Sequence, residues 1–254
     1  MTPGHDRLAQ TAWPGRIGQL MKTVLITGAS RGLGEALVSS FLIRGYRVFG
    51  LVRAPEAAHK MRLSGANAVP IIGDVTDPAV GAAIDDTLRC YPEGLDILIN
   101  NAGTGASICA LQPGIEEEVA AHLDVHCIGT LRVSRAAIPY LRRPATALIV
   151  NVSSRFGSTN NATAGLFADR SLSYAYPIAK AAQNMLTLRM AEELRATGIQ
   201  VCAIHPGRMR TASGSPDAAD TPEKAAERLA KWIAAPPEDI HGNFFELDTG
   251  KRGW

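Results

Sequence analysis

A short apolar run that leads directly into a glycine-rich turn is the feature that most limits the fold of this chain. Residues 23–27, Thr-Val-Leu-Ile-Thr, predict a buried strand, and residues 28–34, Gly-Ala-Ser-Arg-Gly-Leu-Gly, follow without a break. A helical pattern then runs from about Glu35 to Arg44 and is closed by Gly45. In this context, glycines permit a tight turn and let a pyrophosphate approach the backbone at the helix N-terminus. The segment therefore favours a dinucleotide-binding unit over a plain strand-to-helix loop.

The rest of the chain continues this alternation of strands and helices. Strands are predicted at residues 47–52, 68–72, 95–99, 147–152, 199–204 and 243–247, and helices at 78–90, 115–141, 174–197 and 222–234. The alternation predicts an α/β fold, a single-domain Rossmann-type doubly wound parallel sheet of about seven strands with helices on both faces. We expect this domain to span residues 21–254 and residues 1–20 to form a flexible N-terminal extension.

Composition excludes several classes of protein. Apolar residues make up 46% and charged residues 20%, which is typical of a globular domain. A net charge of +2, with Lys and Arg scattered, argues against nucleic acid or an anionic membrane surface as a partner. No apolar run is long enough to cross a membrane, and the first 20 residues lack the apolar segment of a secretory signal.

The cysteines give no sign of a metal site. None of the four has CxxC spacing or histidines at the intervals of a zinc site, so no metal is expected. Reduced, buried thiols in a cytoplasmic protein are the simplest interpretation.

Two arginines bear on the choice of cofactor. Arg53 ends the second strand, where an NAD enzyme usually carries an acid for the ribose 2′-hydroxyl. A guanidinium there suits a 2′-phosphate, and Arg31 in the glycine turn adds a second positive charge. Either arginine alone fits an ordinary surface residue, but together they favour NADP(H), with NAD(H) still possible.

Polar residues also follow the third and fourth strands. Asp74 either caps the next helix or reaches the adenine edge of a cofactor. The run Asn100-Asn-Ala-Gly103 fits a turn, and it equally fits the carboxyl end of a parallel strand, where α/β sheets bind ligands.

Tyr176 and Lys180 form a candidate acid–base pair. Residues four apart lie on one face of a helix, and a nearby ammonium favours the phenolate form of tyrosine. An isolated pair with this spacing is usually only a solvated helix face, so its meaning depends on the other motifs.

In their order, these motifs resemble those of the short-chain dehydrogenase/reductases. The resemblance covers residues 21–254 and rests on five motifs: residues 27–34, residues 100–103, Ser154, Tyr176 with Lys180, and Pro206-Gly207 with Thr211. Residues 153–158, 174–176, 182–186, 205–207 and 244–254 look most like the C-factor and sniffer-type carbonyl reductases within that family.

The resemblance implies a role for each matching residue. Tyr176 would be the general acid/base, Lys180 would lower its pKa and hold the nicotinamide ribose, and Ser154 would orient the substrate oxygen. The residues expected to bind the cofactor are Gly28, Ser30, Arg31, Gly32, Leu33, Gly34, Arg53, Asp74, Val75, Asn101, Ala102, Gly103, Tyr176, Lys180, Pro206, Gly207, Met209 and Thr211.

The chain departs from the family pattern at three positions. His126 stands three residues before Gly129, where the family usually has an asparagine thought to anchor a water in the proton relay to the lysine. An imidazole could hold such a water, or the position could be purely structural. Ala179 replaces a frequent serine, which removes no catalytic group, and Pro177 is acceptable in the first turn of a helix.

The resulting expectation is an NADP(H)-dependent oxidoreductase that transfers hydride between nicotinamide and a carbonyl or secondary alcohol. The alternative, motivated by His126, is a cofactor-binding signalling or regulatory protein with a weak or vestigial site. A nucleotide-sugar epimerase is less favoured, because little sequence follows the last strand. The substrate pocket is expected from residues 104–112, 156–173 and 208–221, and the family predicts a homodimer or homotetramer.

Overall fold

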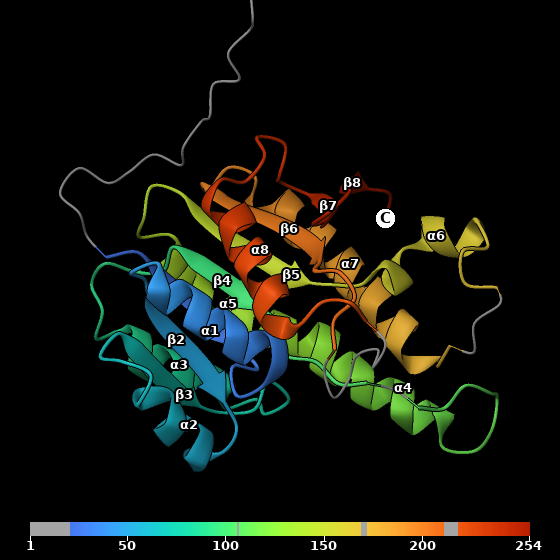
Figure 1. Ribbon diagram of the computed structural model, residues 1–254, viewed down its shortest axis with the longest axis horizontal. Helices are drawn as coiled ribbons and strands as arrows, with labels where there is room; N and C mark the ends of the chain where they lie inside the picture. The colour runs from blue at the N-terminus through green and yellow to red at the C-terminus, as the bar shows by residue number, and fades with distance from the viewer. Residues whose placement is uncertain (1–20, 106, 169–171, 211–217) are drawn as a thin grey trace, which may run out of the picture.

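The computed structural model describes residues 21–105, 107–168, 172–210 and 218–254, and in them one sheet forms the centre of the molecule (Figure 1). Its strands are β1 (Thr23–Thr27), β2 (Arg47–Val52), β3 (Ala68–Ile72), β4 (Ile97–Asn100), β5 (Ala147–Val152), β6 (Ile199–His205), β7 (Asn243–Glu246) and β8 (Gly250–Arg252). The helices are α1 (Gly32–Ile43), α2 (Pro55–Arg62), α3 (Val80–Leu88), α4 (Ile115–Leu123), α5 (Gly129–Leu141), α6 (Thr159–Thr163), α7 (Ala175–Leu194) and α8 (Pro222–Ala234).

The sheet has the strand order β3-β2-β1-β4-β5-β6-β7-β8. Strands β1 to β7 pair in parallel, and β8 returns antiparallel to β7. The chain runs outward from β1 to β3 and then crosses back to place β4 on the other side of β1. At such a reversal, the loops after the two central strands separate and leave a crevice at their carboxyl ends. The predicted α/β class and parallel sheet are confirmed.

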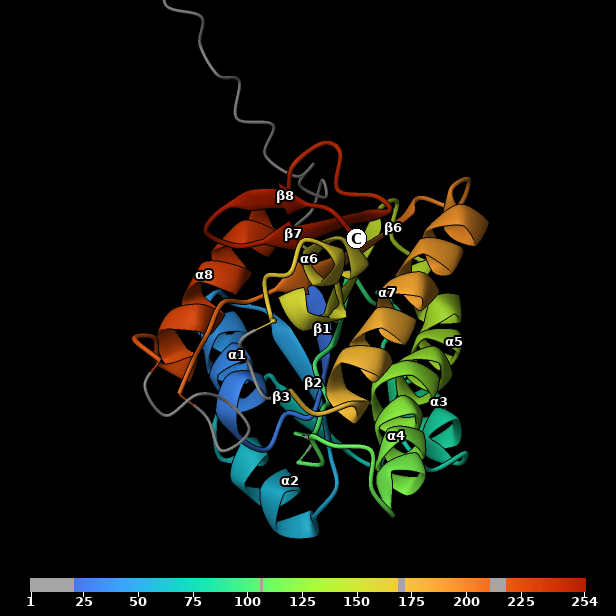
Figure 2. The ribbon, with the colours of Figure 1, turned by 90° about the vertical axis from the view of Figure 1, so that its right-hand side faces the viewer.

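Helices cover both faces of the sheet, as the side view shows (Figure 2). Helices α1, α2 and α8 lie on one face, and α3, α4, α5 and α7 lie on the other. Alternating side chains of β1 supply both cores: Val24 and Ile26 pack with the α1 and α8 side, and Leu25 packs with the α3 and α5 side. Because both faces are covered, β1 is apolar almost throughout and is fully buried.

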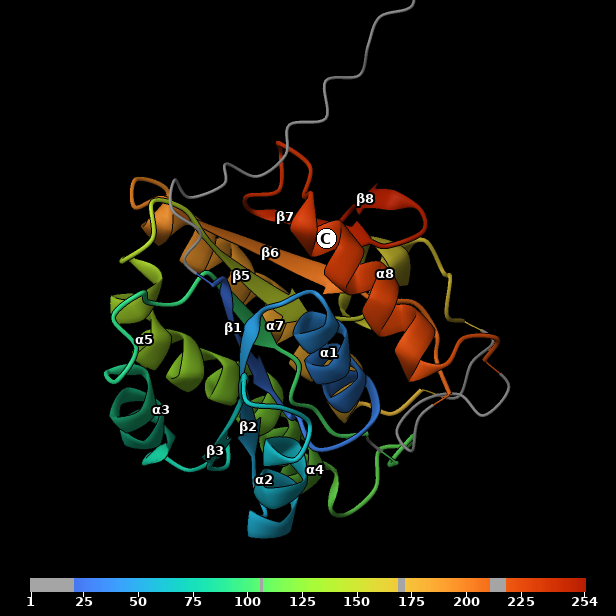
Figure 3. The same ribbon diagram turned by 60° about the vertical axis from the view of Figure 1, so that its left-hand side comes forward.

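Helices α1 and α8 pack directly against each other in front of β1 (Figure 3). Thr221 begins α8 by accepting a hydrogen bond from the Lys224 N–H at its Oγ1, and Pro222 occupies the first turn of the helix. The predicted bounds of this helix, 222–234, agree with the structure.

The structure corrects several element predictions. The helix expected over 115–141 is divided by a π-helical turn at Asp124–Ile128, which contains His126. Helices α2 and α6 and strand β8 were not predicted, and α6 lies in the segment 156–173 that was expected to contribute to the substrate pocket. Several boundaries also move: α1 begins at Gly32 and β4 begins at Ile97.

Among the residues that the structure describes, none of the helices combines the length and the apolar composition that a membrane span requires. The same residues contain no group of three or more His, Cys, Asp or Glu side chains placed to hold a metal ion.

Candidate active site

A cavity of about 760 Å³ opens at the carboxyl ends of the parallel strands. Its walls come from the segments that follow β1 to β6, together with the π-helical turn and the start of α7. This is the edge of the sheet where the strand order reverses and where α/β proteins bind their ligands.

The glycine turn after β1 is bound tightly to the end of β4. Thr27 Oγ1 accepts hydrogen bonds from the backbone N–H groups of Asn101 and Ala102, both at 2.9 Å. The Asn101 side chain donates to the Thr27 carbonyl oxygen at 2.9 Å. A Cβ on Gly34 would lie 2.1 Å from the Gly28 carbonyl oxygen, so this position admits no side chain.

The same turn fits a dinucleotide. Gly28 and Gly32 have φ angles of 65° and 56°, in the left-handed region that favours glycine. No side chain caps the N-terminus of α1. The first N–H groups of this helix therefore remain available to a pyrophosphate at the floor of the cavity.

Three charged residues mark the end of the cavity near β2 and β3. The Arg53 guanidinium lies 3.7 Å from the Asp74 carboxylate, and Arg31 lines the same cavity. Burial by itself would raise the pKa of Asp74, but hydrogen bonds from Thr76 and the charge of Arg53 hold that pKa below its usual value. Asp74 binds Thr76 and does not cap α3, which corrects one of the two readings of this residue.

Ser154 and Tyr176 face each other across the other end of the cavity. Ser154 follows β5 and begins the 3-10 turn Arg155–Gly157, and its Oγ accepts a hydrogen bond from the Phe156 N–H at 3.3 Å. Burial raises the pKa of Tyr176, and a hydrogen bond with Ser154 opposes that rise. The pKa of Tyr176 is therefore raised in the structure, whereas the nearby Lys180 was expected to lower it.

Among the described residues, the Lys180 ammonium donates its hydrogen bonds to groups other than the Tyr176 hydroxyl. Its Nζ lies 5.8 Å from the centre of the Tyr176 ring. It donates hydrogen bonds to the Val152 carbonyl oxygen at 2.7 Å and to Gln183 Oε1 at 2.9 Å. Burial lowers the pKa of Lys180 to about 7.

A chain of buried side chains continues from Lys180 to the neighbouring helix. Gln183 Nε2 donates to Thr130 Oγ1 at 3.1 Å, and Thr130 Oγ1 donates to the His126 carbonyl oxygen at 2.8 Å. Gln183 is fully buried. Lys180 is thus connected to the π-helical turn through protein side chains, and the connection ends on the backbone of His126.

The imidazole ring of His126 takes no part in this chain of hydrogen bonds. Its Nε2 lies 3.1 Å from the Thr104 carbonyl oxygen, and its Nδ1 has no hydrogen-bond partner among the described residues. The ring meets Tyr176 edge-on, with 5.5 Å between ring centres. Burial and the nearby Lys180 charge lower the pKa of His126 to about 2, so the ring is neutral.

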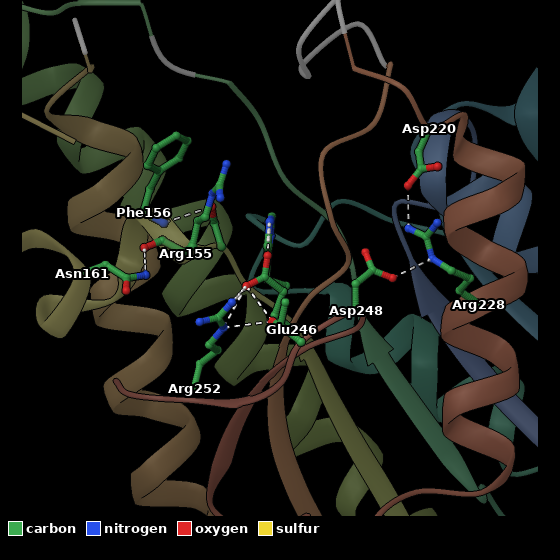
Figure 4. A network of polar contacts seen from close by, with 11 residues as sticks. Arg155, Phe156, Asn161, Asp220, Arg228, Glu246, Asp248 and Arg252 are labelled. Atoms are coloured by element: carbon green, nitrogen blue, oxygen red, sulfur yellow. Dashed lines mark hydrogen bonds and ion pairs between the residues drawn. The ribbon is translucent and has the colours of Figure 1, made fainter. Parts of the chain in front are cut away.

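A polar network lies where β6 and β7 end (Figure 4). Arg228 binds Asp220 at 2.6 Å and Asp248 at 3.5 Å, and Arg252 binds Glu246 at 2.9 Å. The two Arg228 ion pairs join α8 to the segments that contain Asp220 and Asp248, and the Arg252–Glu246 pair joins β8 to β7.

The cavity brings together nearly every residue that the sequence singled out. It is lined by all of the predicted catalytic residues, Ser154, Tyr176, Lys180 and His126, and by the predicted cofactor-binding residues except Thr211. Thr211 lies outside the described residues.

Sequence reasoning missed four polar residues at or next to this cavity. Arg155 and His205 line it, and Gln183 and Thr130 lie behind Lys180. His205 stands beside the Pro206-Gly207 motif, which could have drawn attention to it. Gln183 and Thr130 are on different helices, so only the folded structure shows their connection.

The fold and the glycine turn define a Rossmann-type dinucleotide-binding protein. Comparison with known families narrows this class: the chain belongs to the short-chain dehydrogenases, whose family model matches residues 22–221. It is therefore an NAD(P)-dependent oxidoreductase of that family, as the sequence motifs suggested.

Individual relatives agree with this assignment. The chain is 32% identical to "Oxidoreductase UcpA" of Escherichia coli over 222 residues, which cover 84% of this chain and 80% of that protein. It is 32% identical to "C-signal" of Myxococcus xanthus over 160 residues, 63% of this chain and 93% of that protein.

Two solved structures are similar over nearly the whole chain. The carbonyl reductase Sniffer of D. melanogaster superposes with a TM-score of 0.84 at 25% identity, covering 92% of this chain and 100% of that one. An NADPH-bound carbonyl reductase from chicken fatty liver superposes with a TM-score of 0.82 at 28% identity, covering 92% and 99%.

Proposed function

We propose that this protein is an NADP(H)-dependent carbonyl reductase or alcohol dehydrogenase in which Tyr176 moves the proton. The observation that carries the proposal is the placement of Ser154, Tyr176 and Lys180 at one end of a cavity whose other end holds the glycine turn, Arg31 and Arg53. The solved structure with NADPH bound supports this choice of cofactor by similarity.

Each residue of the site would have its own role in the reaction. Bound cofactor supplies the hydride at its nicotinamide ring. Ser154 Oγ–H would orient the carbonyl oxygen, and the Tyr176 hydroxyl would donate its proton to that oxygen. The raised pKa of Tyr176 keeps the phenol protonated at neutral pH, as a proton donor requires. The ammonium of Lys180 would stabilise the phenolate left behind.

Loss of the tyrosine hydroxyl tests the proton-transfer role. Tyr176→Phe should lower kcat/KM for NADPH-dependent carbonyl reduction by about 100- to 10,000-fold, the usual contribution of a positioned general acid. NADP⁺ affinity, measured by calorimetry, should stay nearly unchanged, because the aromatic ring remains.

Tyr174→Phe provides a matched control for this experiment. Tyr174 is an exposed tyrosine at the start of the same helix and does not line the cavity, so wild-type turnover is expected. Undiminished turnover in Tyr176→Phe would remove the proposed role. Cofactor binding without reduction of any ketone, aldehyde or quinone in a broad panel would favour the regulatory alternative.

The arginines test the choice of cofactor. Arg53→Ala should reduce the ratio of kcat/KM for NADPH over NADH by about tenfold or more, since a charge-assisted bond to the 2′-phosphate is lost. The variant also leaves Asp74 without its ion pair, which adds repulsion toward a phosphate. Equal use of both cofactors by the wild-type protein would contradict the roles given to Arg31 and Arg53.

A further inference from the structure

Arg155 is a half-buried residue of the cavity wall whose charge is not matched. Its backbone is fixed, because the Arg155 carbonyl oxygen accepts hydrogen bonds from Asn161 Nδ2 at 3.2 Å and from the Ser158 N–H at 3.3 Å. Its guanidinium forms no ion pair or hydrogen bond with any residue that the structure describes, and Figure 4 shows only the contact between Asn161 and its backbone.

The acids in this part of the molecule already have partners. Glu246 is bound by Arg252, and Asp248 is bound by Arg228. Asp74 is the only described acid that lines the cavity, and it pairs with Arg53 at the opposite end. An anionic ligand in the cavity would supply Arg155 with the counter-charge that the described residues do not provide.

His205 adds a second unmatched group at the same end. Its side chain is about nine-tenths buried and lines the cavity, and neither ring nitrogen has a hydrogen-bond partner among the described residues. Its Nε2 lies 3.9 Å from Glu246 Oε1, too far for a hydrogen bond. Burial lowers the pKa of His205 to about 4, against the opposing effect of the Glu246 carboxylate, and the charge of Arg155 adds to the lowering, so the ring is neutral. A neutral imidazole offers one N–H donor to a ligand.

We propose that the substrate of this enzyme carries an oxyanion, a carboxylate or a phosphate, that Arg155 binds with His205 as an additional donor. The inference rests on the carbonyl reduction proposed above. A guanidinium presents two parallel N–H groups, which match the two oxygens of a carboxylate or phosphate. Arg155 directly follows Ser154, so the anion and the reacting carbonyl belong to one small molecule. This favours short oxo acids or phosphorylated hydroxyketones over neutral compounds.

The test measures binding without turnover. Calorimetry of the full-length protein saturated with NADP⁺ would compare 2-oxo, 3-oxo and 4-oxo acids with their methyl esters, and dihydroxyacetone phosphate with dihydroxyacetone. An oxidised cofactor cannot reduce a carbonyl, so these complexes are stable. At least one anion should bind about 10- to 100-fold more tightly than its neutral partner, and high salt should weaken this preference. The pair that shows the preference distinguishes a carboxylate from a phosphate.

Variants assign the preference to Arg155. Arg155→Met should abolish it while leaving affinity for the neutral partner nearly unchanged, and Arg155→Lys should restore part of it. Arg62→Met, an exposed arginine of α2 outside the cavity, should bind like wild type. The proposal is overturned if no anion binds more tightly than its neutral partner, if Arg155→Met keeps the preference, or if Arg155→Met instead weakens NADP⁺ binding tenfold.

Turnover with NADPH separates this inference from the proposed function. Tight anion binding that depends on Arg155, with no carbonyl compound reduced, would leave the anion site standing and reject the reductase. Reduction of the esters without preferential binding of the acids would support the reductase and reject the anion site.

Discussion

Gln183 is a buried residue of α7 that is closely tied to the proposed chemistry through Lys180. Its carboxamide oxygen accepts a hydrogen bond from the ammonium of Lys180, and its carboxamide nitrogen donates to Thr130. An acceptor at this distance favours the charged form of the lysine, against the burial that lowers its pKa to about 7. We therefore regard Gln183 as a positioning residue that acts through Lys180.

Two substitutions at Gln183 should move the pH dependence of activity in opposite directions. Gln183→Met removes the acceptor and should shift the alkaline limb of kcat/KM to lower pH. Gln183→Glu introduces a carboxylate beside the ammonium and should shift that limb upward, by about one unit or more. The measurement is the pH profile of NADPH-dependent reduction from pH 5 to 10.

Thr187→Val is the control for these variants. Thr187 is buried one turn further along α7, where its hydroxyl accepts a hydrogen bond from Asn151 and donates one to the backbone carbonyl oxygen of Gln183. Its loss leaves the Gln183 carboxamide in place, so it should reduce stability without moving the limb. A shift in the same direction for both Gln183 variants would show that the residue only supports packing.

At the scale of elements, the turn between β1 and α1 depends on the absence of a side chain at Gly34. Gly34 lies within α1, where alanine would ordinarily stabilise the helix by about 0.5–1 kcal/mol. Here an added Cβ would lie 2.1 Å from the Gly28 carbonyl oxygen and 2.7 Å from Asn101 Nδ2. The turn must therefore open to accept it.

Gly34→Ala and Gly81→Ala should have opposite effects on thermal stability. At Gly81 in α3 the new Cβ would meet Ala136 at 3.7 Å, an ordinary contact, so Gly81→Ala should raise Tm by about 2–4 °C. Gly34→Ala should lower Tm and weaken NADP⁺ binding, as measured by scanning fluorimetry and calorimetry. Equal stabilisation by both substitutions would show that the turn adapts without cost.

The main elements could be predicted because strands and helices leave different periods in the sequence. The buried strands β1, β4 and β5 are apolar runs, and α8 has bounds that its capping residue and apolar pattern define. Helix α2 has only eight residues, of which Ala58 and Met61 are buried, so it shows no clear period. All three residues of strand β8 are exposed, and the strand is defined by its pairing with β7.

The residues of the site also separate into those that the sequence could predict and those that it could not. Ser154, Tyr176 and Lys180 could be located because their spacing is local and their motif is widespread. The π-helical turn at Asp124–Ile128 and the bond from Gln183 to Thr130 lie where α7 packs against α4 and that turn. Contacts between residues far apart in sequence leave no periodic signal, and so they could not be predicted.

For the whole molecule, the buried lysine makes stability depend on pH. Lys180 has a pKa of about 7 in the folded protein, against 10.5 for an unperturbed lysine. Between these values the unfolded chain holds a proton that the folded protein does not, so the free energy of unfolding rises with pH in this window. The contribution opposes folding below pH 7, where both states are protonated and the folded state must bury the charge.

The Lys180→Met variant isolates this effect in the cofactor-free protein. The difference in Tm, wild type minus variant, should increase as the pH rises from 7 to about 10, because the variant lacks this titration. Scanning fluorimetry across that range measures it. Lys231→Met, at an exposed lysine of α8, should give a difference that does not change with pH in this way. A Tm difference for Lys180→Met that stays constant would show that the lysine remains charged in the fold.

The parallel sheet also decides how this protein can be attached to a surface. Strands β1 to β7 all point their carboxyl ends toward the cavity, so the residue before each strand lies at the opposite edge. Met21 and Lys22 enter β1 from that edge, and the five residues of the strand cover about 16 Å before the glycine turn. A support or fusion partner joined through residue 21 is therefore held on the far side of the sheet, and an immobilised molecule would present its cavity outward to solution.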